Sequence, residues 1–367
     1  MEIKPGYKMT EIGIIPDDWE ISSIKNLCPL QRGFDLPRKQ AIEGAFPVIY
    51  SNGTLNSHNT FQVKSPGVVT GRSGTIGKVV YVEDNFWPHN TTLWVTNFHG
   101  NNPKYIYYLL TSIGLHRWGT GSGVPTLNRN DVHEILVAKP TTNEQKRIAN
   151  TLSDIDSLIT SLEKLIGKKK LIKQGAMQEL LTGKKRLPGF SGKWETKTID
   201  DIFSYERPDK YIHWDTDLEN IGSVPVLTAN KSFILGYAKC ADGICSNLPA
   251  IIFDDFTTDS KFVSFPFKVK SSAIKILRTK HRADDLRFIH GLMKLIKFSL
   301  GGHKRYYLSE YRHLEVIMPS SEEQKAISDV LESMDSEIKA LTQQLSKYRL
   351  IKEGMMQELL TGRIRLI

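Results

Sequence analysis

The hydrophobic pattern is most regular in two stretches, residues 140–187 and 319–367. In each, apolar residues recur at alternating spacings of four and three: Ile148, Leu152, Ile155, Ile159, Leu162 and Ile166 in the first, and Ile327, Leu331, Met334, Ile338, Leu341, Leu345 and Tyr348 in the second. This spacing forms one narrow apolar seam on an α-helix, which is typical of helices that pair with a single partner. It predicts two long helices, each roughly 60 Å at 1.5 Å per residue, packed against each other as an antiparallel intramolecular coiled coil.

Start and stop signals bound both predicted helices. Directly after a proline, each stretch has the residues of a capping box, Thr141 with Glu144 in the first and Ser320 with Glu323 in the second. Each stretch closes with a glycine placed for a left-handed C-cap, Gly183 or Gly362. Gly167 and Gly175 weaken the first helix, so a bend or break could form near them.

The two stretches are copies of each other. From Pro140 and Pro319 they align without a gap and are identical at 24 of 48 positions, including the phrase MQELLTG. An ungapped repeat of this length indicates an internal duplication. A Trp-Glu pair also recurs near the start of each intervening block, at Trp19 and at Trp194.

The blocks between the helices share an order of elements but little sequence. In the first we expect strands at 77–82 and 92–95 joined across a polar turn, a helix at 103–110 and a strand at 135–138. In the second we expect strands at 224–227, 250–253 and 272–277, a helix at 285–298 and a strand at 314–317. The chain is therefore predicted to be an α+β tandem duplication with pseudo-two-fold symmetry. Its parts are a globular domain at 1–139, a helix at 140–187, a second globular domain at 188–318 and a second helix at 319–367.

Composition and charge narrow the functional classes only slightly. The chain has 367 residues, with 40% hydrophobic and 24% charged residues, as in ordinary globular proteins. It has no apolar run near 18 residues and only three cysteines, Cys28, Cys240 and Cys245, without zinc-site spacing, so a cytoplasmic location is predicted. The net charge of +9 fits contact with a polyanion such as nucleic acid, and equally fits a solvated surface.

Polar loops supply the candidate DNA contacts of the first block. The run 70–78 places Arg, Ser, Thr and Lys side chains on a glycine-rich backbone, from which they could donate to phosphates and base edges. It fails the Walker pattern, because Arg72 stands where glycine is needed and Val79 where Ser or Thr is needed. The candidate residues of this block are Arg72, Ser73, Thr75, Lys78, His89, Asn90, Ser122 and Thr126. An ordinary hairpin and surface loops remain the alternative.

The second block offers a basic, aromatic run at 303–307, whose long cations beside aromatic rings suit phosphate contact. Its candidate residues are Lys231, Lys261, His303, Lys304, Arg305 and Tyr306. A charged surface loop is again the alternative. The acidic run 254–261 resembles a metal or nuclease cluster only in its grouped carboxylates, and it lacks a second acid-Lys element.

Catalytic motifs are absent from the sequence. There is no N/D-P-P-Y/F phrase of amino-methyltransferases, no H-E-x-x-H, no G-x-S-x-G and no Walker motif. We therefore predict no catalytic residue, no metal ligand and no cofactor of its own. Two alike helices carrying two unlike domains suggest a common scaffold that presents two different DNA readers, since two-fold proteins read paired half-sites about one helical turn apart.

At these residues the sequence resembles the specificity subunits of type I restriction–modification enzymes, over essentially the whole chain. The twin helices with Pro140…Glu144-Gln145-Lys146 and Pro319…Glu323-Gln324-Lys325, each ending in QELLTG, carry the resemblance. The phrases at 71–77 and 265–273 also look like those of target-recognition domains.

The resemblance implies a non-catalytic subunit whose two domains each read half of a split double-stranded DNA target. It implies that the helices set the gap and dock two methyltransferase subunits, and that endonuclease subunits join the complex. S-adenosylmethionine, ATP and Mg²⁺ would be bound by those partners, and no membrane is involved. A coiled-coil adaptor with two protein-binding domains is the alternative from another class, and a stand-alone enzyme is a second.

Overall fold

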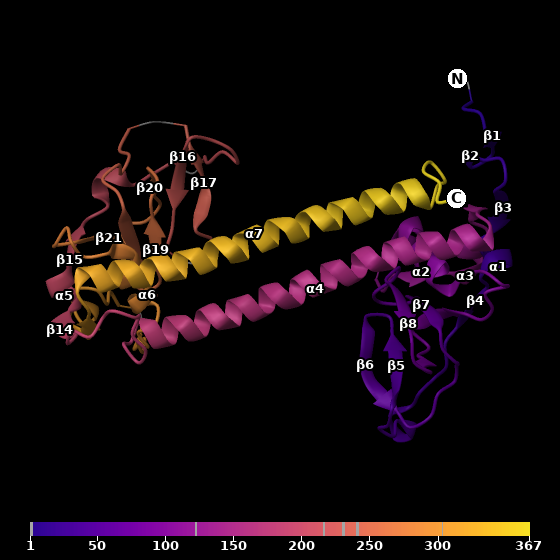
Figure 1. The fold of residues 1–367 in the computed structure, drawn as a ribbon, viewed down its shortest axis with the longest axis horizontal. Helices are drawn as coiled ribbons and strands as arrows, with labels where there is room; N and C mark the ends of the chain where they lie inside the picture. The colour runs from indigo at the N-terminus through magenta and orange to yellow at the C-terminus, as the bar shows by residue number, and fades with distance from the viewer. Residues whose placement is uncertain (1–2, 122, 216, 230–231, 240–241, 303) are drawn as a thin grey trace. The chain divides into compact units, whose positions relative to one another are not determined.

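The computed structural model describes residues 3–121, 123–215, 217–229, 232–239, 242–302 and 304–367. It consists of two compact units, each containing one globular domain and half of each long helix (Figure 1). Unit 1 comprises Met1–Glu163 and Gln343–Ile367, and unit 2 comprises Lys164–Thr342. The boundary between the two units therefore falls within both long helices.

The globular domain of unit 1 is built mainly of short strands. Its strands are β1 Tyr7–Thr10, β2 Gly13–Pro16, β3 Glu20–Ser23, β4 Leu30–Arg32, β5 Phe46–Tyr50, β6 Gly53–His58, β7 Gly67–Gly71, β8 Val79–Val82, β9 Trp87–Pro88, β10 Thr92–Val95, β11 Gly119–Thr120, β12 Thr126–Leu127 and β13 Leu136–Lys139. Its helices are α1 Ile24–Leu27, α2 Pro103–Ile113 and α3 Arg129–His133, with 3-10 turns η1 Arg38–Gln40 and η2 Leu115–Trp118.

The globular domain of unit 2 is also built mainly of short strands. Its strands are β14 Glu195–Thr198, β15 Phe203–Glu206, β16 Val224–Leu227, β17 Ile234–Ala238, β18 Ala250–Asp254, β19 Ser260–Val263, β20 Lys268–Val269, β21 Ile274–Thr279 and β22 Glu315–Met318. Its helices are α5 Ile199–Ile202 and α6 Leu286–Met293, with 3-10 turns η3 Asp209–Tyr211 and η4 Tyr311–His313.

The two domains share one sheet topology. The four-stranded order β4-β10-β7-β8 of unit 1 recurs in unit 2 as β15-β21-β18-β19, and β6-β5-β9 recurs as β17-β16-β20. A two-stranded sheet, β13-β3 or β14-β22, precedes each long helix. Even the irregularity in the β5–β6 pairing has its counterpart between β16 and β17. The predicted α+β duplication is confirmed at the level of strand order.

The predicted long helices are α4, Thr142–Leu180, and α7, Ser321–Leu359, of 39 residues each. In unit 1 they run antiparallel, because Lys352 pairs with Asp156 and Arg349 with Glu163 further along α4. In unit 2 Lys169 pairs with Glu337, and Lys173 with Asp335, in the same sense. No break occurs at Gly167 or Gly175, since α4 is one continuous helix.

The predicted apolar seam is buried. All six seam residues of α4, from Ile148 to Ile166, are at most 9% exposed, and those of α7 are buried or half-buried. The predicted glycine caps are also present, with φ of 70° at Gly183 and 72° at Gly362. That left-handed conformation is strained for any residue with a side chain, which explains the glycines.

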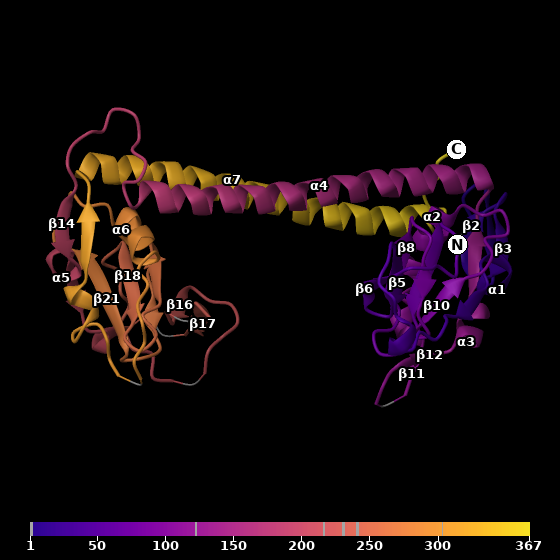
Figure 2. The same cartoon turned by 90° about the horizontal axis from the view of Figure 1, so that it is seen from below.

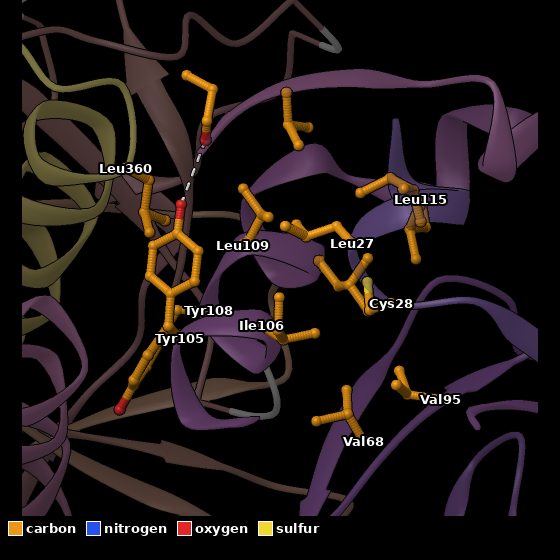
Figure 3. Close-up of a cluster of buried hydrophobic side chains, with 14 of the residues drawn as sticks. Leu27, Cys28, Val68, Val95, Tyr105, Ile106, Tyr108, Leu109, Leu115 and Leu360 are labelled. Carbon is orange, nitrogen blue, oxygen red and sulfur yellow. Dashed lines mark hydrogen bonds between the residues drawn. The ribbon is translucent and has the colours of Figure 1, made fainter. Parts of the chain in front are cut away.

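Each domain has one main core, which its long helices help to close. In unit 1, Tyr105, Ile106 and Leu109 of α2 pack with Leu27 and with Leu360 beyond the end of α7 (Figure 3). The first seam residues of α4 belong to the same core. Figure 2 shows α2 and α6 between the sheets and the long helices of their own units. The seam therefore serves the domain cores as well as helix pairing.

Two local expectations were wrong. The strands β8 and β10 do not form a hairpin, because β7 lies between them and pairs with both. Helix α6 ends at Met293 rather than at residue 298, and Leu295, Ile296 and Phe298 reach the unit 2 core from irregular backbone. Their apolar character, which suggested more helix, reflects burial alone.

A histidine in α6 gives unit 2 a pH-dependent stability. Burial, with Lys294 and Lys261 nearby, lowers the pKa of His290 to about 4. Between pH 6.5 and 4 this histidine is protonated in the unfolded chain but stays neutral in the folded protein. Folding stability that is present above pH 6.5 is therefore lost as the pH falls toward 4. His290 packs on Phe262, as Tyr107 packs on Tyr81 in unit 1.

We therefore expect the free energy of unfolding of the wild type to fall by up to about 3 kcal/mol between pH 6.5 and 4 because of His290, and we expect His290→Tyr to abolish this decrease. Urea denaturation of the wild type and the variant across this pH range measures the difference. The carboxylates titrate in both proteins, so their contribution cancels in the comparison. Parallel curves of stability against pH for the two proteins would show that folding does not lower the pKa of His290.

Candidate nucleic-acid interface

Three loops of unit 1 that lie far apart in the sequence meet at one end of the four-stranded sheet. The backbone N–H groups of Arg72 and Ser73 donate to the carbonyl of Thr91 at 2.8 and 3.2 Å. Leu127 N donates to the carbonyl of Arg72 at 2.7 Å, and Ser73 forms a β-bridge with Thr126. The predicted contacts around Arg72, His89 and Thr126 therefore belong to one surface.

Glycines let these loops approach closely. A Cβ on Gly71 would lie 1.9 Å from the carbonyl oxygen of Thr75, and one on Gly77 would lie 2.3 Å from the backbone nitrogen of His116. Gly77 also has a φ of 76°. The glycine pattern that superficially suggested a phosphate loop thus serves the folding of a tight β7–β8 connection.

The side chains of this connection differ in freedom. Among the described residues, no hydrogen bond or ion pair engages the half-buried guanidinium of Arg72. Thr75 is exposed, while Lys78 donates from Nζ to the carbonyl of Asn52 at 2.9 Å. An Arg held by its backbone with a free guanidinium suits contact with a base edge or a phosphate.

His89 and Asn90 border the same surface. The His89 ring stacks on Tyr50, with centroids 4.3 Å apart, and its Nδ1 lies 3.0 Å from the Thr91 hydroxyl. Burial lowers the pKa of His89, so its ring is neutral near pH 7. The Asn90 amide donates to Asp35, and this bond lowers the pKa of that carboxyl. Asn90 is thus already engaged within the protein.

The corresponding loop of unit 2 is supported by a buried ion pair. Lys275 Nζ lies 3.0 Å from Asp255 Oδ2, and their side chains are 5% and 2% exposed. Asp255 Oδ1 accepts from Tyr307 N at 2.7 Å, and the Asp255 carbonyl accepts from Tyr306 N at 2.8 Å. The pair therefore fixes the segment that follows the basic loop.

The structure corrects the prediction for Tyr306. This residue is fully buried, its ring packs on Phe298, and its hydroxyl donates to the carbonyl of Gly302. It belongs to the core and is not available to a ligand. Arg305 lies over the ring of Phe256 at 6.0 Å, and Lys304 pairs with Glu310.

The remaining predicted residues of unit 2 divide into two groups. Lys261 lies on β19, where it lines a cleft against α6 and the long helices. His303 and Lys231, like Ser122 in unit 1 and Cys240, lie outside the described residues.

The acidic run 254–261 has a structural role. The Asp254 carboxylate accepts from the backbone N–H groups of Phe256 and Thr257, both at 2.9 Å, and so caps the β18–β19 turn. Asp255 is held by Lys275. Within the described part of the chain, no group of three or more His, Cys, Asp or Glu side chains could hold a metal ion.

The glutamates at the helix starts hold distant parts of the chain together. The predicted capping is only half formed: Thr141 and Ser320 each accept from the N–H three residues on, at 3.4 Å, but no described bond returns from the glutamate to the cap backbone. Instead, Glu144 accepts from Trp19 Nε1 at 2.8 Å and from Arg365 Nε and Nη2 at 2.8 and 2.9 Å.

Unit 2 repeats this arrangement with the corresponding residues. Glu323, 1% exposed, accepts from Trp194 Nε1 and from Nε and Nη2 of Arg186. The bond to Glu323 raises the pKa of Arg186, as the bond to Glu144 raises that of Arg365. We call these two sets the helix-start clamps. The next residue, Gln145 or Gln324, bonds to the start of α2 or to Asp285 before α6.

Comparison with known proteins accounts for the duplicated architecture. The type I restriction modification DNA specificity domain matches the chain twice, at residues 16–174 and 191–347. The chain belongs to the type I restriction–modification DNA specificity family. Each match contains one globular domain and most of the helix that follows, so the family unit corresponds to one half of the duplication.

Relatives in this specificity family match different lengths of the chain. The Escherichia coli type I restriction enzyme EcoR124I/EcoR124II specificity subunit is 35% identical over 181 residues, covering 46% of this chain and only 44% of the relative. A putative type I restriction enzyme MjaX specificity subunit of Methanocaldococcus jannaschii is 24% identical, covering 98% and 96%.

Solved structures support the specificity-subunit fold. The type I restriction–modification S subunit from M. genitalium matches with a TM-score of 0.68 and 15% identity over 98% of both chains. A chain from a study of complex assembly in a type I system matches with a TM-score of 0.56 and 12% identity, over 95% of this chain and 99% of that one. Of the helices that the structure describes, none is long and apolar enough to cross a membrane.

Proposed function

We propose that the two units read the two halves of a split double-stranded DNA target, each through the loops at one end of its four-stranded sheet. The observation that carries this proposal is the meeting of three loops around Arg72, whose backbone is fixed while its guanidinium has no hydrogen bond or ion pair with a residue that the structure describes. In unit 2 the equivalent β18–β19 loop carries different chemistry, with Phe256 under Arg305. Equal frameworks with unequal loops fit two different half-sites.

The chain would catalyse nothing itself. Its long helices would set the gap between the half-sites and dock two methyltransferase subunits, which endonuclease subunits would join. Those partners would bind S-adenosylmethionine, ATP and Mg²⁺. Family membership supports this proposal, and the exposed polar faces of α4 and α7 leave surface for partners.

Methylome sequencing tests the proposal. A host without DNA methylation would express the chain with its cognate methyltransferase subunit, and single-molecule sequencing would map modified bases. A split motif with an unspecified central gap is expected. A continuous motif, or no modification beside a methyltransferase shown to be active, would contradict the two-reader arrangement and favour the adaptor alternative.

Changing Arg72 should affect one half-site only. We expect Arg72→Gln to relax base preference in the half read by unit 1, with about 10- to 100-fold weaker discrimination, since a good Arg–base contact is worth about 1–3 kcal/mol. Competition binding with singly substituted targets measures this. Arg305→Gln is the reciprocal control and should act on the other half. Equal effects of both variants on both halves would refute the assignment.

A further inference from the structure

Each unit has a cleft in which the outer strand of the four-stranded sheet and the second helix of the domain face the long helices. In unit 2 its volume is about 390 Å³, and it is lined from β19, α6, α4 and α7. In unit 1 the equivalent cleft is lined from β8, α2 and α4. Figure 1 shows α6 and β19 beside α7 within unit 2.

Corresponding positions establish that the clefts are equivalent. The Phe262–His290 ring contact of unit 2 matches Tyr81–Tyr107 in unit 1, with centroids 6.2 and 6.0 Å apart. The ion pair between Lys173 and Asp335 matches that between Lys352 and Asp156. The frameworks of the two clefts are therefore alike.

Their charges differ. The described lining of the unit 1 cleft has three carboxylates, Glu83, Asp84 and Asp156, and one lysine, Lys104, which pairs with Glu83. The unit 2 lining has two carboxylates, Glu332 and Asp335, and four cations, Lys173, Lys261, Arg287 and Lys294. Similar frameworks thus carry an excess of carboxylates in unit 1 and an excess of cations in unit 2.

Two of the cations in unit 2 are unneutralised. Arg287 is occupied by Asp285, Asp329 and Glu332. Neither Lys261 nor Lys294 has an ion pair or a side-chain hydrogen bond with any residue that the structure describes. Partial burial and the charges of Lys173 and Lys261 lower the pKa of Lys294, with Asp335 acting in the opposite direction.

We propose that Lys261 and Lys294 in the unit 2 cleft bind a phosphate group of the DNA backbone. This rests on the proposed function. Strand β19 links the cleft to the proposed interface, because Lys261 lies at its start, directly after the β18–β19 loop in which Phe256 underlies Arg305. A phosphate here would position the duplex on unit 2 without reading sequence. The acidic cleft of unit 1 offers no such contact, so backbone anchoring is one-sided.

Salt dependence of DNA binding tests this. The full-length chain would be titrated with duplex containing its target and with unrelated duplex from 50 to 200 mM salt. In a variant carrying Lys261→Gln and Lys294→Gln, the slope of log K against log salt should fall by about 1 to 2, since each released phosphate contact contributes about 0.9. Affinity should fall by the same factor on both duplexes. Lys339→Gln, an exposed cation of α7 outside the cleft, is the matched control.

Inorganic phosphate separates the sources of the anion. Phosphate should raise the melting temperature of the wild type above that in chloride of equal ionic strength, and not that of the double variant. A phosphate effect with an unchanged DNA slope would mean a free-anion site and overturn the DNA assignment. An unchanged slope without a phosphate effect would overturn the proposed phosphate site altogether, while DNA binding by the wild type would leave the proposed function intact. A wild type that binds no DNA would instead remove both.

Discussion

Replacing Lys275 with methionine is expected to lower the free energy of unfolding of unit 2 by about 3–5 kcal/mol, because it leaves the Asp255 carboxylate buried without its counter-charge. Asp255 is 1% exposed and Lys275 4% exposed, so water cannot replace the lost partner. The same carboxylate holds the N–H of Tyr307. Loss of the pair should therefore also release the segment that carries Lys304 and Arg305.

Urea denaturation, followed by a probe in unit 2, measures the loss of stability. Lys280→Met is the matched control, since Lys280 is half exposed and only 3.9 Å from Asp200, a surface pair worth at most about 1 kcal/mol. The double variant Lys275→Met with Asp255→Asn should recover part of the loss, because no unpaired charge stays buried. If Lys275→Met were no more damaging than Lys280→Met, the pair would not support the fold.

The effect of Lys275→Met on the segment that carries Lys304 and Arg305 can be measured separately from its effect on stability. At temperatures where the Lys275→Met protein is still folded, discrimination in the half-site read by unit 2 should weaken while the other half is unaffected. Arg72 lies in the other unit, so its half-site provides the internal standard. A uniform loss on both halves would indicate general unfolding rather than movement of this loop.

Local and periodic signals explain what the sequence could predict. The seam from Ile148 to Ile166 follows from a four-three spacing typical of helices that pair with one partner, and the glycine caps follow from φ values that only glycine adopts easily. The duplication itself predicted that both domains share an order of elements. These features need neighbours in sequence only, so they were predicted well.

Contacts between distant residues explain what it could not. Tyr306 beside Lys304 and Arg305 looked like part of a basic surface, yet only the fold shows that its ring packs on Phe298. The sequence assigned Glu144 to a cap three residues away, whereas its partner Arg365 lies 221 residues further on. The recurrence of Trp19 and Trp194, and of an arginine after each QELLTG phrase, was the available signal for the clamps.

The helix-start clamps lead to the second large effect. We expect Glu144→Gln to lower the free energy of unfolding of unit 1 by about 3 kcal/mol, because it replaces charge-assisted bonds from Arg365 with weaker ones and leaves an amide NH₂ facing the donors of Trp19 and Arg365. Glu323→Gln is the matched variant and should act on unit 2 through Arg186 and Trp194. Hydrogen exchange measured by mass spectrometry distinguishes the local effects of the two variants.

In the Glu144→Gln protein, faster exchange should be confined to the start of α4 and to residues 363–367, whereas Glu323→Gln should affect the start of α7 and residues 186–194. Arg365→Gln combined with Glu144→Gln should cost less than the sum of the two single changes, since the second removes a partner already lost. Additive losses would show that the two side chains stabilise unit 1 independently. Arg365 follows α7, and Trp19 lies between β2 and β3. A coupled result would therefore mean that this clamp joins segments far apart in the sequence in unit 1, as Arg186 and Glu323 do in unit 2.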